Sequence, residues 1–426
     1  MIKAITGTKD ILPSELSKWY FLENTVKKNF TSFNYKEIRT PIFEETALFA
    51  RSIGEETDIV GKEMYTFLDR SETSITLKPE MTAGVVRAFI EHSLGKQQSL
   101  NKLFYISPMF RQEKPQAGRL RQFHQFGGEA LGSNSMILDA ELIGIAYSIL
   151  KGLGLEDLQV KINSMGIPES RGSYKKKLRE FLEDKKDKLS EDSRKRLDTN
   201  ILRLFDSKIE SDQEIMKDAP LLLDNIDDKS KDDFNKVKEF LTRLQIPFEV
   251  DPTLVRGLDY YTKTTFEILS GKVGSQSALV GGGRYDLLVE QMGGAPTPGV
   301  GFAAGIERIL LACENEKSLI LSDDKIDLYI VKLDKGLTYE LMDLALSFRK
   351  KNFSVDFDYL DRSVKAQMRE ANKLNARYVL FLGGEEYKSG LVSLKNMQSG
   401  EQKEFALKDA EEMIKVISPD EALRIK

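Results

Sequence analysis

The chain has 426 residues, of which 41% are hydrophobic and 31% charged; this predicts a globular protein of about two or three domains and excludes a disordered, collagen-like or coiled-coil chain. Its 63 basic and 67 acidic side chains give a net charge of −4, which excludes a uniformly basic nucleic-acid coat but not RNA binding through a local basic face. No apolar run approaches the roughly 18 residues that a membrane span requires. The first residues lack the apolar segment of a secretory signal, so we expect a cytoplasmic protein.

Residue types suited to metal or redox chemistry are scarce. Cys313 is the only cysteine, so the chain cannot form an internal disulfide or a paired-cysteine zinc site, and we expect a small core residue there. His92 and His124 are the only histidines. We therefore predict no protein-bound metal site and no histidine-rich relay.

The first chemically suggestive segment is 77–82, within a region (1–165) that mixes strand-like runs with helical stretches. Glu80 and Thr82 follow Pro79 and lie on one side of an extended chain, where an ammonium group fits between carboxylate and hydroxyl. For this segment alone, a turn leading into a helix over 83–93 is the stronger interpretation.

The segment 104–132 carries the strongest signal. Two strand-like runs flank a polar loop that contains Lys114, Pro115 and Gly118. Side chains at alternate positions share a face of a strand, so the second run is predicted to place on one surface Arg119, Arg121, Phe123, Gln125, Gly127 and Glu129, joined by Arg111 and Glu113 from the first run. Guanidiniums match phosphate oxygens and an aromatic ring offers a stacking plane, so this surface suits a nucleoside triphosphate beside a polar small molecule. A solvated surface hairpin is the alternative.

Residues 169–240 differ in composition from the rest of the chain. About half of them are charged, and apolar residues recur at helical spacing. Basic side chains outnumber acidic ones in 169–208, whereas acidic ones are in excess in 209–239. We interpret this stretch as an inserted helical module with a basic first half; an ordinary solvated helical surface is the alternative.

Two further segments precede the last domain. In 254–261, Arg256 stands before a glycine and two tyrosines that enter a strand; a strand edge with core tyrosines is the plainer interpretation. Residues 299–311 are predicted to form a helix opened by small residues, with Arg308 inside it. The glycine spacing alone is weak support for phosphate binding.

From residue 325 strand and helix patterns alternate, which predicts an α/β domain with a partly parallel sheet. Strands are expected at 326–333, 354–360, 377–384, 391–396 and 403–408, and helices at 338–351, 363–375 and 409–417. The first strand is not followed by a glycine-rich phosphate loop, so we expect a macromolecule-binding module rather than a mononucleotide site.

Together these segments resemble the signature motifs of class II aminoacyl-tRNA synthetases, and within that class the histidyl-tRNA synthetase family. The first motif resembles residues 35–41, ending at Pro41; the second resembles 109–113 with Phe123 and Glu129; the third resembles 305–308. The blocks 254–261 and 281–294 are typical of the histidine enzyme. The resemblance covers essentially the whole chain, and five ordered motifs are specific as a set.

The resemblance implies an α+β catalytic core over 1–324, with an antiparallel sheet flanked by helices, interrupted by the insertion at 169–240 and followed by an α/β anticodon-binding domain over 325–426. It implies histidine–tRNA ligase activity with ATP and Mg²⁺, in a homodimer built around the first motif. The insertion would lie over the acceptor stem of the tRNA, so its loss is expected to weaken tRNA charging more than adenylate formation.

The resemblance also implies a role for each candidate residue. Catalysis is assigned to Arg111, Arg256 and Arg308. Histidine is assigned to Glu80, Thr82, Gln125, Glu129 and Tyr261, with the last two at the imidazole. ATP is assigned to Arg111, Glu113, Arg119, Phe123 and Arg308. Lys78 and Lys114 stand where arginine is common in the family, which bears on contacts with the tRNA end more than on adenylation.

Three alternatives stay open at this point. One is the catalytically silent, synthetase-like regulatory subunit of ATP phosphoribosyltransferase, which usually lacks the anticodon domain and has eroded motifs. Another is a sister class II synthetase for proline, threonine or glycine. The third is an RNA-binding module without enzymatic activity, which would not need the full set of arginines.

Overall fold

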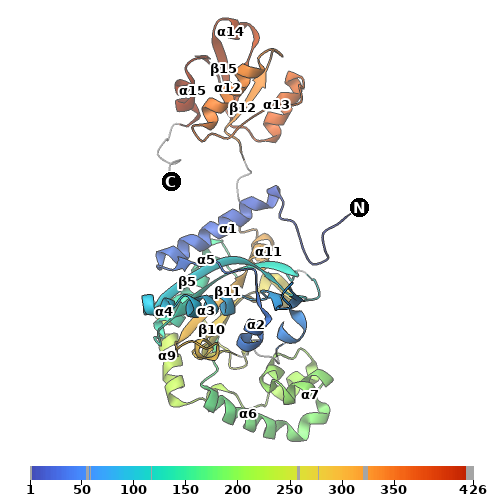
Figure 1. The fold of residues 1–426 in the computed structure, drawn as a ribbon, viewed down its shortest axis with the longest axis vertical. Helices are drawn as coiled ribbons and strands as arrows, with labels where there is room; N and C mark the ends of the chain where they lie inside the picture. Colours follow the sequence, from blue (N-terminus) through green and yellow to red (C-terminus); the bar gives the residue numbers. More distant parts are fainter. Residues whose placement is uncertain are drawn as a thin grey trace. The chain divides into compact units, whose positions relative to one another are not determined.

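The structure is a computed structural model that describes residues 2–53, 57, 59–116, 118–256, 260–276, 278–319 and 325–418. The chain forms two compact units, Met1–Ile320 and Leu321–Lys426, which are drawn in Figure 1. No described helix is long and apolar enough to cross a membrane.

The larger unit is built on an eight-stranded sheet with the order β1-β5-β6-β11-β10-β9-β7-β8. The pairs β1–β5 and β7–β8 are parallel, and every pair between them is antiparallel. The predicted antiparallel sheet is therefore confirmed. In chain order the strands are β1 (Lys36–Glu37), β5 (Asn101–Phe110), β6 (Gln122–Leu131), β7 (Leu158–Ser164), β8 (Glu249–Val250), β9 (Thr262–Ser270), β10 (Ala278–Arg284) and β11 (Gly299–Gly305).

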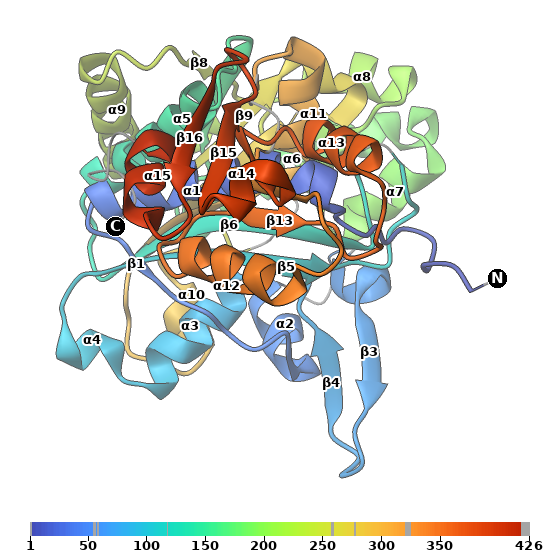
Figure 2. The same cartoon turned by 90° about the horizontal axis from the view of Figure 1, so that it is seen from above.

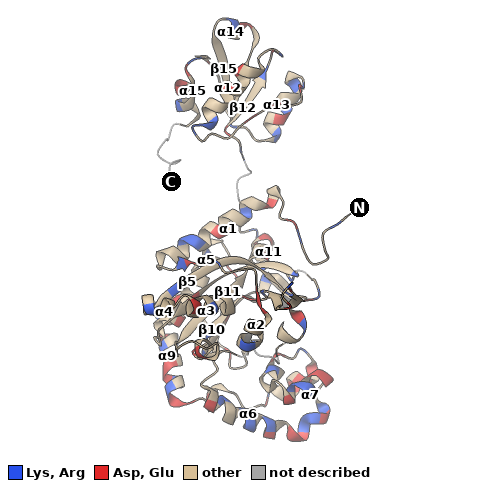
Figure 3. Ribbon diagram, viewed as in Figure 1, with Lys and Arg blue, Asp and Glu red and all other residues tan. Residues whose placement is uncertain are grey.

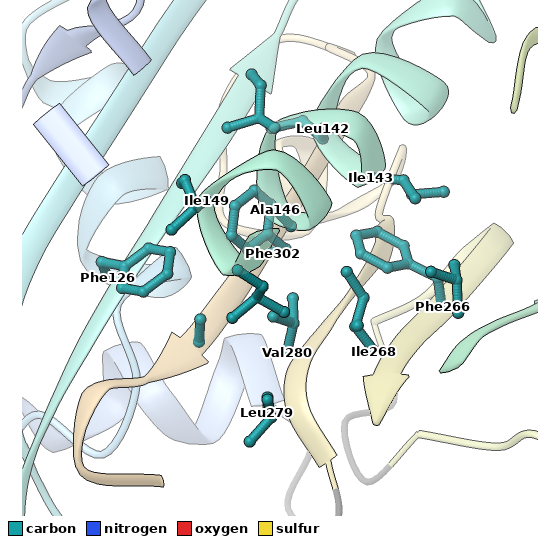
Figure 4. Close-up of a cluster of buried hydrophobic side chains, with 14 of the residues drawn as sticks. Phe126, Leu142, Ile143, Ala146, Ile149, Phe266, Ile268, Leu279, Val280 and Phe302 are labelled. Atoms are coloured by element: carbon teal, nitrogen blue, oxygen red, sulfur yellow. The ribbon is translucent and has the colours of Figure 1, made fainter. Parts of the chain in front are cut away.

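One face of this sheet carries the main hydrophobic core. The helices α1 (Pro13–Ser32), α5 (Ile137–Gly152) and α11 (Ile306–Glu316) cover it, and Figure 4 shows apolar residues of α5 over those of the central strands. Phe30 of α1 stacks on Phe104 of β5 with ring centroids 5.0 Å apart. Burial of aromatic and aliphatic side chains on this one face thus stabilises the sheet, and the opposite face does not contribute to the main core.

The opposite face has a smaller cluster and a cavity. Helices α3 (Thr82–Glu91) and α10 (Leu288–Gln291) contribute to this cluster together with buried tyrosines. The short helix α4 (Leu94–Gln97) follows α3, and the 3₁₀ segment η5 (Gly271–Gln276) joins β9 to β10.

A second, three-stranded sheet has the order β2-β4-β3. Figure 2 shows β3 and β4 projecting together as a hairpin. Its elements are β2 (Phe43–Glu45), β3 (Tyr65–Leu68) and β4 (Ser74–Leu77), with the helix α2 (Thr46–Ile53) and the π-helical segment η1 (Ile59–Glu63) nearby in sequence.

The region predicted as a helical insertion is helical. Its elements are α6 (Pro168–Leu182), η2 (Glu183–Lys188), α7 (Glu191–Asp198), η3 (Ile201–Asp206), α8 (Glu210–Met216), η4 (Leu223–Asn225) and α9 (Asp228–Arg243). Residues from Met165 to Ile226 share a hydrophobic cluster of their own, and Figure 3 shows basic and acidic residues interleaved along α6 and α7. Helix α9 instead buries Phe234, Val237 and Leu241 in the main core, so by packing it belongs to the body of the unit.

The smaller unit has a five-stranded sheet with the order β13-β12-β14-β15-β16. Strand β12 is parallel to β13 and β14, whereas β15 and β16 continue antiparallel, as the predicted α/β pattern requires. The elements are β12 (Leu328–Lys332), α12 (Thr338–Arg349), β13 (Val355–Phe357), α13 (Val364–Lys373), β14 (Tyr378–Leu382), α14 (Gly384–Lys388), β15 (Leu391–Asn396), β16 (Gln402–Ala406) and α15 (Ala410–Ile417).

One predicted element is wrong. The small residues from Gly299 onward do not open a helix; they form strand β11 in the centre of the sheet, and helix α11 begins only at Ile306. Val300, Phe302 and Ala304 point into the main core, whereas the other face carries only small residues: Gly299, Gly301, Ala303 and Gly305. This period of two is the pattern of a strand. The alternation is hard to recognise in the sequence because most residues of the segment are small.

Candidate active site

A cavity of about 380 Å³ lies on the face of the sheet away from the main core. Strands β6, β9, β10 and β11, helices α3 and α11 and the loop between β5 and β6 all contribute to its lining. Ten of the candidate residues predicted from sequence line it: Glu80, Thr82, Arg111, Glu113, Arg119, Phe123, Gln125, Arg256, Tyr261 and Arg308. Residues up to 228 positions apart in the chain are thus brought to one site.

Glycines on the central strands make room for polar side chains that lie against the sheet. A Cβ at Gly281 would lie 2.0 Å from Nη2 of Arg256, and one at Gly301 would lie 1.6 Å from Oε2 of Glu129. Any side chain at these positions would occupy the space of the guanidinium or the carboxylate. The glycine-rich blocks 281–283 and 299–301 therefore serve the site as well as the fold.

Four arginines gather around the cavity. Arg308 donates from Nε to the carbonyl of Gly118 at 2.9 Å and from Nη1 to that of Ala278 at 3.1 Å. Burial and the positive charges of Arg119, Arg111 and Arg256 lower the pKa of Arg308. Because like charges this close repel one another, the arrangement favours a polyanion that lies between them.

The acidic partners of these arginines keep them oriented. Glu113 lies 3.0 Å from Nη1 of Arg119 and 3.6 Å from Nη1 of Arg111. Glu267 of β9 forms an ion pair with Arg256. The sequence analysis missed Glu267, because its pairing with Arg256 depends on where the segment before β9 runs.

Phe123 offers a ring at one end of the arginine cluster. The guanidinium carbon of Arg111 lies 5.3 Å from the centroid of that ring, and Nε of Arg111 donates to the carbonyl of Pro79 at 2.9 Å. A planar heterocycle can stack at such a site next to a cation.

Polar groups without guanidiniums form the other end of the cavity. Both oxygens of Glu80 accept backbone N–H groups at the start of α3, from Thr82 at 2.7 Å and Ala83 at 2.8 Å, while burial raises the pKa of Glu80. Oε1 of Gln125 is buried and accepts no hydrogen bond from the described part of the chain. An unused buried acceptor beside a carboxylate suits an ammonium group.

Glu129 lies beneath this end and not on the cavity lining. Its carboxylate is fully buried, accepts from the hydroxyl of Thr82 at 2.8 Å and from that of Tyr285 at 2.5 Å, and burial raises its pKa to about 8. Tyr285 does line the cavity. It is a second site residue that the sequence analysis missed, although it lies in the block 281–294 that carries the family resemblance.

Some sequence-based expectations fall outside the cavity. Arg121 does not line it, since its side chain donates to the carbonyls of Glu113 and Thr6, both at 3.4 Å. Strand β6 begins at Gln122, so the strand alternation does not extend to Arg121, and Arg119 reaches the cavity from the loop. Gly257, Leu258 and Asp259 of the block 254–261 lie outside the described residues.

The remaining singled-out residues have structural environments. Lys78 is buried beside Thr40 and Met81, and burial lowers the pKa of its ammonium to about 8. Cys313 is buried in the main core. Nδ1 of His124 lies 2.9 Å from Glu307. Among the described residues no group of three or more His, Cys, Asp or Glu side chains is placed to hold a metal ion.

Comparisons with known proteins agree with the resemblance seen in the motifs. Residues 7–309 match the family model described as histidyl-tRNA synthetase, and residues 327–417 match that of an anticodon binding domain. The chain is 48% identical over 417 residues to the histidine–tRNA ligase of Halothermothrix orenii, covering 98% of this chain and 100% of that protein. The ligase of Caldanaerobacter subterraneus is also 48% identical, over 415 residues, 97% of this chain and all of that protein.

A solved structure agrees with these relatives. The apo histidyl-tRNA synthetase of S. aureus superposes with a TM-score of 0.81 at 37% identity, covering 98% of this chain and 99% of that one. Both the motifs and the full-length match point to the same group of enzymes, and the chain belongs to the histidyl-tRNA synthetase family.

Proposed function

We propose that this chain activates histidine with ATP to form histidyl-adenylate and then transfers the histidyl group to the 3′ end of its cognate tRNA. The observation that carries this proposal is the cavity itself. Four arginines adjoin a polar end lined by the carboxylate of Glu80, the hydroxyl of Thr82 and the amide of Gln125, whose Oε1 accepts no hydrogen bond from the described residues. Full-length relatives that are histidine–tRNA ligases support it and make the silent regulatory subunit the weaker candidate.

ATP would occupy the arginine-rich end. Phe123 stacks on the adenine, with Glu113 near its edge. Arg111 binds the α-phosphate, and Arg119 and Arg308 bind the β- and γ-phosphates. The mutual repulsion of these guanidiniums is relieved when a triphosphate lies between them. Magnesium would enter with ATP, as part of the substrate.

Histidine would occupy the other end. Its ammonium group lies between Glu80, Thr82 and Gln125, and it would donate to Oε1 of Gln125, which accepts no hydrogen bond within the described part of the chain. Its imidazole meets Tyr261 and, after a small shift of Thr82 or Tyr285, Glu129. A buried pocket that hydrogen-bonds a polar side chain leaves its own groups unpaired when an apolar analogue binds, and such sites discriminate by about 10⁴–10⁵-fold.

The first step requires positioning more than acid–base catalysis. The histidine carboxylate attacks the α-phosphorus in line, the bond to pyrophosphate breaks, and negative charge spreads over the phosphate oxygens. Arg256 and Arg111 would stabilise that charge, and the carboxylate is already ionised, so no general base is needed. In the second step a hydroxyl of the terminal adenosine attacks the acyl carbon and releases AMP.

The other modules would bind tRNA. Residues 325–426, which match an anticodon binding domain, would contact the anticodon, and the insertion would lie over the acceptor stem with its basic first half.

The chain would work as a homodimer. Next to Pro41, Ile42 and Phe43 are exposed, as are Phe67 and Leu68 on the projecting hairpin. Exposed apolar side chains gathered on one small sheet suit a two-fold interface. Sedimentation of the active protein as a monomer would overturn this part of the proposal.

The test is amino-acid-dependent exchange of pyrophosphate into ATP with each of the twenty amino acids. We expect exchange with histidine alone, followed by charging of histidine tRNA. Exchange with another amino acid would assign the chain to a sister specificity. No exchange from folded protein would favour the regulatory-subunit alternative.

A further inference from the structure

The insertion lies outside all the signature motifs, but it contacts the segment 254–261 that carries Arg256 and Tyr261. Val255, the residue before Arg256, packs against the hydrophobic cluster of the insertion rather than the main core. The backbone just before it is held from the sheet, where Nδ2 of Asn163 donates to the carbonyl of Leu254 at 3.0 Å. One end of the segment is therefore clamped between β7 and the insertion.

The other end is held by Arg171 of α6. Nη1 of Arg171 donates to the backbone carbonyl of Tyr261 at 2.8 Å. A guanidinium on a carbonyl oxygen makes a charge-assisted bond, which is stronger than a bond between neutral groups. Arg171 also lines a second cleft of about 300 Å³ whose wall includes Val255, Arg256 and Tyr261.

The residues just before α6 form backbone hydrogen bonds with the chain just after Tyr261. The N–H of Lys263 donates to the carbonyl of Gly166 at 2.9 Å, and the N–H of Met165 donates to the carbonyl of Lys263 at 2.6 Å. Nζ of Lys263 lies 3.1 Å from Asp233 of α9. The residues just before α6 are thus hydrogen-bonded to the beginning of β9, directly after Tyr261.

We propose that Arg171 is a positioning residue for the amino-acid activation step, and that the insertion acts in adenylate formation as well as on tRNA. This inference rests on the proposed roles of Arg256 and Tyr261. Reaction rates in preorganised sites fall steeply when reacting groups are misplaced by about 1 Å. Arg171 fixes the backbone at Tyr261, and with it the ring at the histidine end of the cavity.

The test uses the full-length protein without tRNA, so that no tRNA contact contributes. In Arg171→Met the aliphatic stem is kept and the donor is lost, while Arg171→Lys keeps a charged donor. Lys176→Met is the matched control, because Lys176 is an exposed residue on the same helix and its replacement removes the same charge. Histidine-dependent pyrophosphate exchange is measured as separate KM values for histidine and ATP and as kcat per titrated active site.

We expect Arg171→Met to raise the KM for histidine or lower kcat so that kcat/KM falls about tenfold, with the KM for ATP changed less. Arg171→Lys should recover part of the loss, and Lys176→Met should match the wild type. A loss confined to the number of active sites, with unchanged KM and kcat, would mean that Arg171 only supports folding and would overturn the proposal.

Two further outcomes are informative. Normal exchange by Arg171→Met together with weaker tRNA charging would overturn the proposal. It would limit the insertion to a role in tRNA binding, which is the role that the sequence alone predicts. Absence of histidine-dependent exchange in the wild type would instead refute the proposed function on which it rests, so the two failures are distinguishable.

Discussion

The two sheets of this molecule use their faces in opposite ways. In the smaller unit, strand β12 is buried at every position, with apolar clusters against both faces. In the larger unit, one face carries the main core, but the facing positions of β10 and β11 include Gly281 and Gly301, over which polar side chains lie. A sheet that only supports a fold fills both faces with side chains, whereas one that floors a polar cavity leaves part of a face bare.

This contrast predicts where the chain tolerates change. In the smaller unit the harmful change is loss of volume, because packing there is the main source of stability. On the cavity floor the harmful change is addition of volume or removal of a charged group, because the polar side chains of the candidate site lie over the glycines there.

The largest effect is expected at a charged group on the floor. Arg256→Ala should lower the kcat of histidine-dependent pyrophosphate exchange about 10²–10³-fold, since a donor aimed at the developing phosphate charge is lost. The matched control is Arg243→Ala at the exposed end of α9, which removes the same charge. An Arg256→Ala enzyme with near-normal kcat would remove this arginine from the proposed mechanism.

Adding one methyl group at either of two neighbouring glycines of β10 should have different effects, because one faces the cavity and the other faces the main core. Gly281→Ala should lower exchange about 10²-fold by displacing the guanidinium of Arg256, with little change in melting temperature, because a flexible side chain can move. Gly282→Ala places its Cβ 2.4 Å from the carbonyl oxygen of Gly301 and 2.6 Å from Cβ of Phe302, so it should destabilise the protein by about 1–3 kcal/mol.

Thermal melts and exchange assays on both variants check this pair. If the two glycine variants lost stability and activity to the same extent, the distinction between the cavity-facing and the core-facing position would be wrong.

The reverse experiment removes volume from the smaller unit. Leu380 of β14 is fully buried in the cluster of that unit, so Leu380→Ala should lower the free energy of unfolding of that unit by about 2–5 kcal/mol. Calorimetry should show that the smaller unit unfolds at a lower temperature than in the wild type. Near that temperature tRNA charging should weaken, while pyrophosphate exchange persists. Parallel loss of exchange would show that the catalytic unit depends on the smaller one.

The smallest effect concerns the buried carboxyl under the floor. Burial raises the pKa of Glu129 from 4.5 to about 8, so between these values the folded protein holds a proton that the unfolded chain has released. The free energy of unfolding should therefore fall as pH rises from about 5 to 8, by at most about 1.4 kcal/mol per pH unit from this group.

Glu129→Gln should have a flatter dependence over that range, because the amide does not titrate. Denaturant unfolding of ligand-free protein at several pH values provides the measurement. Glu80, whose pKa burial also raises, adds a slope of the same sign to both proteins, so only the difference between the two curves is assigned to Glu129. Parallel curves for the two proteins would contradict the raised pKa of Glu129.

Much of the site was predictable because charged and aromatic residues mark it in local runs. The β5–β6 hairpin, Phe123 and Gln125 follow from strand alternation, and Arg111, which lies just beyond β5, follows from the motif resemblance. Arg121 shows the limit of that reasoning, since alternation holds only inside the strand and β6 begins one residue later. Glu267 and Tyr285 carry no local signal that separates them from ordinary strand and core residues.

The sequence by itself determined the alternating α/β pattern of 325–426, the helical character of the insertion and the family, because periodicity and motif order are local or cumulative properties of the chain. Only the tertiary structure decided that Gly299–Gly305 is a central strand, that α9 packs in the main core, that Glu129 lies beneath the cavity and that Arg171 holds Tyr261. Each of these depends on a partner distant in the chain, and burial and pairing between distant segments are settled only when the chain folds.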